Sequence, residues 1–190
     1  MTKAPASGPV VLVLASGRGE RFLASGGQGS KLQALLAGKP VLDWTLAAVR
    51  ESGLPFHVED AGHPGMGDSI AAAVKATSDA PGWLVLPGDL PLVRADTLRA
   101  VASAMREDGV EIVVPVYRGQ RGHPVGFPKG CGFALMALSG PMGAASIVRA
   151  RSVRELVVDD EGIGVDVDTV DALAAAERVL RARGGAGPGL

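Results

Sequence analysis

Short runs of apolar residues recur along the chain, and each has the length of one β-strand. The run at 9–15 (PVVLVLA) is continuously apolar, which is typical of a strand covered on both faces. Similar runs predict strands at 83–87, 111–117 and 153–158, and a weaker pattern predicts one at 55–59.

The segments between these runs place apolar residues three and four positions apart, as in amphipathic helices. This spacing predicts helices at 41–52, 67–77, 95–107, 143–151 and 169–183. Because strands alternate with helices, we expect an α/β fold with a doubly wound, mostly parallel sheet. Ligands of such sheets bind where the loops leave the carboxyl ends of the strands.

Composition narrows the kind of protein. A chain of 190 residues fits one domain, expected at 9–183, and the Gly-, Ala- and Pro-rich ends 1–8 and 184–190 are expected to be disordered. The net charge of −1 favours a small-molecule partner over nucleic acid or an anionic membrane. Cys131 is the only cysteine, so we expect it in the core. No apolar run approaches the roughly 20 residues of a membrane span, which predicts a cytoplasmic protein.

The loop after the first strand is the first candidate site. Residues 14–31 contain five glycines, and the amides of such a loop can surround phosphate oxygens. Arg18, Arg21 and Lys31 would add charge-assisted hydrogen bonds. The loop is neither a dinucleotide fingerprint, because Phe22 replaces the third glycine, nor a Walker loop, because a leucine follows the lysine. A flexible linker is the alternative, but the position after a buried strand favours anion binding.

Acidic residues suggest a cation site. Asp89 lies just beyond the strand predicted at 83–87, and magnesium commonly uses one or two protein carboxylates. Asp166 and Asp168 would point to one face of an extended segment, so either or both could reach the same Mg²⁺. Asp168 could instead cap the following helix. The acidic pair 159–160 is interpreted as a solvated turn.

Five motifs in a fixed order carry a family resemblance. They are LASGRGERF at 14–22 with a later Lys31-Leu32, GKP at 38–40, GMGDSI at 65–70, GDLP at 88–91 and DVDT at 166–169. Together they resemble the MobA-like nucleotidyltransferases, and most closely the molybdenum cofactor cytidylyltransferases. The cytidylyl branch is indicated by GQRGHP at 119–124 and by Ser16, where the guanylyl branch usually carries glycine.

The resemblance implies transfer of CMP from CTP to the phosphate of molybdopterin, with release of pyrophosphate and transient contact with a molybdoenzyme. It implies a nucleotide site near Leu14, Ala15, Ser16, Gly17, Arg18, Gly19, Gly67, Ser69 and Gly88, with Arg21, Lys31 and Asp89 as catalytic residues. Metal ligands would be Asp89, Asp166 and Asp168, and the acceptor would lie near Gly122, His123 and Pro124. His123 could instead hydrogen-bond within its own turn.

Three departures from the family pattern keep alternatives open. Extra residues between Phe22 and Lys31 make Lys39 a second candidate for the catalytic lysine. The shortened region at 53–65 omits a strand and helix that relatives have. GPMGAA at 140–145 replaces the acid and base of G-D-x-G-A-R. A guanylyltransferase, a sugar-phosphate nucleotidyltransferase and a non-catalytic nucleotide- or cofactor-binding protein therefore stay as alternatives.

Overall fold

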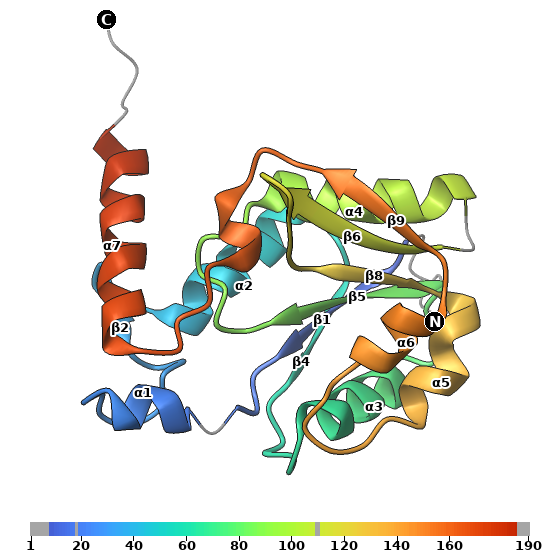
Figure 1. The fold of residues 1–190 in the computed structure, drawn as a ribbon, viewed down its shortest axis with the longest axis horizontal. Helices are drawn as coiled ribbons and strands as arrows, with labels where there is room; N and C mark the ends of the chain where they lie inside the picture. The colour runs from blue at the N-terminus through green and yellow to red at the C-terminus, as the bar shows by residue number, and fades with distance from the viewer. Residues whose placement is uncertain (1–7, 18, 109–110, 186–190) are drawn as a thin grey trace, which may run out of the picture.

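A mixed β-sheet forms the centre of the computed structural model, which describes residues 8–17, 19–108 and 111–185 (Figure 1). Within these residues seven strands form one sheet. Across the sheet they are β4 (Phe56–Glu59), β1 (Val10–Leu14), β5 (Gly82–Pro87), β8 (Val125–Pro128), β6 (Ile112–Tyr117) and β7 (Gln120–Arg121), with β9 (Val153–Val157) paired to β6. Parts of the expected disordered ends, 1–7 and 186–190, lie outside the described residues.

Among the described residues, the main sheet has three parallel and three antiparallel strand pairs, one of the latter between β6 and β7. β1 pairs in parallel with β4 and β5, and β6 pairs in parallel with β9. β8 is antiparallel to both β5 and β6. The predicted α/β class with a mostly parallel sheet is confirmed, whereas β8 and β7 were not predicted. β8 is a short VGFP segment between prolines, which gives a weak strand pattern.

Helices cover both faces of the sheet, as a doubly wound fold requires. α3 (Met66–Ala76), α5 (Gly132–Met136) and α6 (Ala145–Ala150) pack on one face, and α2 (Val41–Ser52) and α4 (Ala95–Asp108) pack on the other. Successive β1 side chains enter opposite cores: those of 10, 12 and 14 one core, those of 11 and 13 the other. This alternation explains why the strand is apolar throughout.

A third, smaller core attaches the C-terminal helix. α7 (Val170–Gly185) packs near the hairpin of β2 (Leu35–Leu36) and β3 (Lys39–Pro40). The remaining helical turns are α1 (Glu20–Ala24), η1 (Lys129–Cys131) and η2 (Glu161–Gly164). Among the described residues, no helix is both long and apolar enough to cross a membrane.

The acidic pair at 159–160 corrects one prediction. Asp160 is only 2% exposed, so the solvated-turn interpretation is wrong for it. Its carboxylate accepts hydrogen bonds from the backbone amides of Arg94 (2.9 Å) and Gly162 (3.0 Å) and from the Thr97 hydroxyl (2.7 Å). Asp160 therefore links the start of α4 to η2. Backbone N–H groups at the start of a helix have no acceptor within the helix, and the Asp160 carboxylate provides one.

Residues 53–55 lead directly from α2 to β4, the strand at the edge of the sheet. The omission of a strand and helix relative to other members stays a prediction. The carboxyl ends of β1 and β5 point to one side of the molecule, the left of Figure 1, where α1 also lies. The candidate site forms on this side.

Candidate functional site

The Lys31 ammonium lies between two carboxylates at the carboxyl edge of the sheet. Its Nζ is 2.5 Å from Asp89 Oδ2 and 2.5 Å from Asp168 Oδ1. All three residues are buried. Burial alone would lower the pKa of Lys31, but the charges and hydrogen bonds of Asp89 and Asp168 outweigh it and raise the pKa. Lys31 is therefore a protonated cation at neutral pH.

Backbone hydrogen bonds bring these distant segments together. Gly88 N–H donates to the Leu14 carbonyl (2.9 Å), which joins the turn after β5 to the end of β1. Val167 N–H donates to the Asp89 carbonyl (3.0 Å), which places the Asp166–Asp168 segment beside that turn. The three acidic residues that sequence grouped into one site therefore do lie together.

The two late aspartates differ in their surroundings. Burial opposes ionisation of Asp168, but its hydrogen bonds with Asp166 and Lys31 and the charges of Lys31 and Arg21 lower its pKa. Arg21 forms an ion pair with it. Partial burial, the hydrogen bond with Asp168 and the nearby negative charges raise the pKa of Asp166 to about 6. Thr169 Oγ1, not Asp168, accepts from an amide of the first turn of α7 (Ala172 N, 3.1 Å).

The carboxylates fit a hard cation that shares its coordination with substrate. Asp89 Oδ1 is buried and has no hydrogen-bond partner among the described residues. No group of three or more His, Cys, Asp or Glu side chains in the described part of the chain is arranged to hold a metal unaided. Magnesium needs no such cage, since it takes one or two carboxylates and completes its shell with phosphate oxygens and water.

A smaller cavity of about 270 Å³ opens beside Lys31 and Asp89. Ser16 and Ser69 stand on its walls, and their hydroxyl oxygens are 2.6 Å apart, which ties the first loop to α3. Of the residues predicted to bind nucleotide, the cavity is lined by Leu14, Ser16, Gly17 and Ser69.

The other predicted nucleotide residues lie around this cavity without lining it. Gly67 is packed against the 139–140 backbone: its N–H donates to the Gly140 carbonyl (2.8 Å), and a Cβ at this position would meet the Ser139 carbonyl oxygen at 2.8 Å. Ala15 N–H donates to the Glu59 carbonyl (2.8 Å). Gly19 and Gly88 are likewise absent from the lining. Arg18 lies outside the described residues.

A polar cluster beside this cavity was missed in the sequence. The buried Glu59 carboxylate accepts hydrogen bonds from His63 Nε2 (3.0 Å), His57 Nε2 (3.3 Å) and the Ala61 amide (3.3 Å). Burial would raise its pKa, but these partners lower it, His63 most of all. His63 lines the smaller cavity. The alternation H-V-E in β4 with a histidine four residues later was the available signal.

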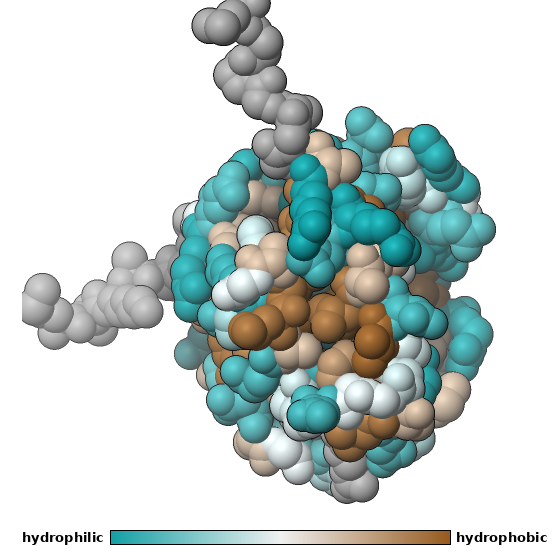
Figure 2. Space-filling view, turned by 90° about the vertical axis from the view of Figure 1, so that its left-hand side faces the viewer, coloured by the Kyte–Doolittle hydropathy of each residue, from teal (hydrophilic) through white to brown (hydrophobic). Residues whose placement is uncertain are grey.

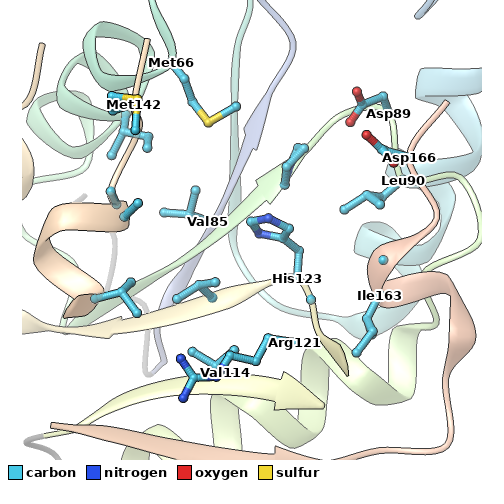
Figure 3. A pocket seen from close by; sticks show the side chains of 18 of the residues that line it. Met66, Val85, Asp89, Leu90, Val114, Arg121, His123, Met142, Ile163 and Asp166 are labelled. Atoms are coloured by element: carbon cyan, nitrogen blue, oxygen red, sulfur yellow. The ribbon is translucent and has the colours of Figure 1, made fainter. Parts of the chain in front are cut away.

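A larger cavity of about 670 Å³ lies on the other side of the same carboxylates (Figure 3). Asp89 and Asp166 stand at one end and Met66 and Met142 at the other, with His123 between them. Most of the remaining wall is apolar, including Ile70, Val85, Leu90, Val114, Val125, Phe127, Val148 and Ile163.

Two of the three predicted acceptor residues, Gly122 and His123, line this larger cavity, and Pro124 does not. Burial lowers the pKa of His123, which keeps the imidazole neutral. Its Nδ1 is buried and has no partner in the described structure, so no hydrogen bond from this atom satisfies its own turn. The site thus offers one unused polar atom in an apolar wall.

The second candidate lysine lies elsewhere. Lys39 Nζ stacks over the Trp44 ring, 4.6 Å from its centroid, and Lys39 lines neither cavity. The geometry therefore favours Lys31 over Lys39 as the cation of the site.

Cys131 is fully buried in the core, as expected, and burial raises the pKa of its thiol.

The face that carries the site is mixed in character. Figure 2 shows a hydrophobic area in its middle, framed by hydrophilic residues. Met66 and Met142, both in the wall of the larger cavity, are 48% and 69% exposed. An apolar group of a substrate would find partners here. Charged groups line the larger cavity at the carboxylate end and also, away from it, at Arg121 and Arg149.

Residues 47–156 match the model of the MobA-like NTP transferase domain, which is more than half of the chain. The chain belongs to this family. The match includes β5, Asp89 and the 119–124 segment, so it contains parts of both cavities. Family membership makes this a MobA-like NTP transferase domain.

Individual relatives agree with the family. The chain is 30% identical over 139 residues to the bifunctional protein GlmU of Geobacter sulfurreducens, covering 60% of this chain but only 29% of that relative. Rv0371c of Mycobacterium tuberculosis is similar in structure, with a TM-score of 0.74, 24% identity and coverage of 90% and 99% of the two chains. That protein also has a structure in complex with manganese.

A second protein of similar structure is molybdopterin-guanine dinucleotide biosynthesis protein A from Archaeoglobus fulgidus. It superimposes with a TM-score of 0.68 at 18% identity and covers 91% of this chain and 99% of its own. At these identities the two structural likenesses show the shared fold of MobA-like NTP transferases, and the choice of base and acceptor has to be argued from this chain's own side chains.

Proposed function

We propose that this MobA-like domain transfers CMP from CTP to the terminal phosphate of molybdopterin, with release of pyrophosphate. The observation that carries the proposal is that the two cavities meet at the charged centre. Lys31, Met66, Pro87 and Asp89 line both of them. A triphosphate in the smaller cavity and an acceptor phosphate entering from the larger one would meet beside Lys31 and Asp89.

The reaction needs positioning more than covalent help from the protein. An oxygen of the acceptor phosphate forms a bond to the α-phosphorus of CTP. The bond from that phosphorus to the oxygen leading to the β-phosphate breaks, and pyrophosphate leaves with the electron pair. Holding the reactants in line and neutralising their charge lowers the barrier of such transfers. Such a transfer therefore needs no side-chain nucleophile.

The chain's own residues would divide this work. Ser16, Gly17 and Ser69 of the smaller cavity would hold the nucleotide. Arg21 lines the larger cavity, and its exposed guanidinium would reach the phosphates from that side. Lys31 would stabilise charge near the α-phosphate. Mg²⁺, held by Asp89 with Asp166 or Asp168, would supply further charge neutralisation on the phosphate oxygens. The unpartnered Asp89 Oδ1 supports this ligand role.

The larger cavity supports a molybdopterin-type acceptor. Its wall is mainly apolar, and Gly122 and His123 of the GQRGHP segment line it. Arg121, His123 and Arg149 are its polar side chains away from the carboxylates, so a sugar bearing many hydroxyl groups would bury most of them against apolar residues, which is unfavourable. A cytoplasmic location and transient contact with a molybdoenzyme remain predictions that accompany this acceptor.

Pyrophosphate release tests the proposal directly. CTP, GTP, UTP and ATP are each assayed with Mg²⁺ against molybdopterin-type and sugar-phosphate acceptors. We expect the fastest release with CTP and the molybdopterin-type acceptor. Release with a sugar phosphate or with GTP would identify a different transferase. Nucleotide binding in a thermal-shift assay without release from any pair would identify a binding protein, an alternative suggested by the altered 140–145 segment.

A further inference from the structure

The Lys31 ammonium occupies the space between the carboxylates that the proposed metal would use. It forms a hydrogen bond with Asp89 and another with Asp168, both of 2.5 Å. The side chains of these three residues are only 11% to 12% exposed. A cation entering from solvent would therefore have to displace a buried, doubly paired ammonium.

Charge balance makes this displacement unfavourable for a free ion. Asp89 and Asp168 contribute two negative charges, which the Lys31 ammonium and the Arg21 guanidinium balance, and the Asp166 carboxyl beside them adds at most one more. The paired carboxylates thus attract a free divalent ion less strongly than three uncompensated carboxylates would. Releasing the ammonium without a new partner would leave a partly buried charge unpaired, which is destabilising.

A nucleoside triphosphate changes both conditions. It brings phosphate oxygens that can receive the ammonium, and it carries several negative charges of its own. Lys31 lines the smaller and the larger cavity, so its flexible stem can move Nζ from the carboxylates toward a phosphate in either. The carboxylate oxygens would then be free for the ion that accompanies the nucleotide.

We propose that Lys31 makes this site select the metal–nucleotide complex over the free metal ion. The proposal rests on the proposed nucleotidyltransferase function and gives Lys31 a role before the chemical step. In the free protein the ammonium blocks the carboxylates. In the complex it binds phosphate and no longer competes with the metal.

Binding of Mn²⁺, followed by its electron paramagnetic resonance signal, tests this without turnover. The full chain, Lys31→Met and the control Lys75→Met are titrated with Mn²⁺ alone and with Mn²⁺ plus a non-hydrolysable α,β-methylene analogue of CTP. Lys75 is an exposed lysine at the end of α3. We expect Lys31→Met to bind Mn²⁺ alone at least about tenfold more tightly than the wild type and the control, within the usual range of coupling between sites. With the analogue, this difference should shrink.

The outcomes separate this inference from the proposed function. Equal affinity of wild type and Lys31→Met for Mn²⁺ alone, with a normal ternary complex, would overturn only the role of Lys31. No binding of Mn²⁺ by the wild type even with the analogue would overturn the proposed function and this inference together. Lys31→Gln repeats the test with a polar side chain, and circular dichroism melting shows that each variant is folded.

Discussion

The two cavities differ in how their walls are held. On the nucleotide side, polar contacts join the segments: Ser16 bonds to Ser69, and Glu59 holds His63. On the acceptor side the wall is mainly apolar, and His123 Nδ1 has no partner in the described structure. The nucleotide half is thus organised before any ligand binds, whereas the acceptor half leaves polar interactions to the ligand. Under the proposed function, nucleotide binding and acceptor choice would therefore reside in different parts of the site.

Asp89→Asn is the strongest test of the shared centre between these halves. It removes the charge that faces Lys31 together with the unpartnered oxygen, so turnover should fall at least about a thousandfold, equivalent to several kcal/mol of transition-state stabilisation. Pyrophosphate release measures the rate. Thermal melting should show a moderate loss of stability, because the buried Lys31 ammonium loses one of its two carboxylate partners and keeps Asp168. The control is Asp60→Asn, because Asp60 is an exposed aspartate that directly follows β4. An active Asp89→Asn enzyme would exclude this residue from the mechanism.

Lys31→Ala should have the next largest effect. Loss of one electrostatic donor reduces the rate by about tenfold to a thousandfold. Lys39→Ala is the matched control, because Lys39 stacks on Trp44 and lines neither cavity. The steady-state rate constants of both variants decide between the lysines. If Lys39→Ala were the impaired variant, the placement of the catalytic lysine at 31 would be wrong.

Glu59→Gln tests the difference between the two cavities, because it should weaken hydrogen bonds beside the smaller, nucleotide cavity and leave the larger cavity unchanged. The variant weakens the hydrogen bonds to His63 and the Ala61 amide. Losing roughly 1 kcal/mol of hydrogen-bond energy corresponds to a rise of about fivefold in KM for CTP, and kcat should stay unchanged. Glu51→Gln on α2 is the exposed control. A change in the KM of the acceptor, with that of CTP unaltered, would contradict the assignment of this cluster to the nucleotide side.

The same glutamate predicts a pH dependence of stability. Because the pKa of Glu59 is lower in the folded protein than its ordinary value of 4.5, its ionised form stabilises the fold. The advantage of wild type over Glu59→Gln should be full above pH 4.5 and disappear as the pH falls through the lower folded pKa. Urea unfolding of both proteins across this range measures it. A difference that persists at the lowest pH would point to another cause.

Ala145→Arg should give the smallest effect and only on the acceptor side. It places a basic group in the wall of the larger cavity, at the position where the family pattern G-D-x-G-A-R has one. We expect the KM of the acceptor to change about threefold, on the order of an exposed charge interaction, while that of CTP stays constant. Ser146→Arg adds the same charge at the next, exposed residue. Equal effects of both variants would show that only net charge matters.

Long apolar runs made most of the fold predictable. The runs at 9–15, 83–87, 111–117 and 153–158 correspond to β1, β5, β6 and β9 within about one residue. β1, β5 and β6 are buried on both faces and therefore need apolar side chains nearly throughout, whereas β9 is only partly buried and carries Arg154 and Glu155. β8 escaped prediction because its pairing with β5 and β6 comes from tertiary contacts. α6 begins later than expected, at Ala145, since Gly143 has a positive φ of 54°.

The site was predictable where its residues follow strands or belong to motifs. Asp89 and Asp168 come together with Lys31 as the motif order suggested. Sequence could not show that Lys31 bridges the two acids, nor that Glu59 holds His63, because both depend on how separate loops converge. Asp160 was misinterpreted for the same reason: its partners on α4 lie more than sixty residues away along the chain.

The contact of α3 with the 139–140 turn sets a rule for redesigning this protein. Gly67 N–H donates to the Gly140 carbonyl, and the Gly140 N–H donates to Asp68 at 2.9 Å, so these two hydrogen bonds fix the turn whose following residues line both cavities. Side chains at 142 and 145 line the larger cavity and can be exchanged to alter the accepted compound while these hydrogen bonds are kept. Replacing Gly67 would push the turn away and change both cavities at once. Selectivity can therefore be engineered at these two side chains and not at Gly67.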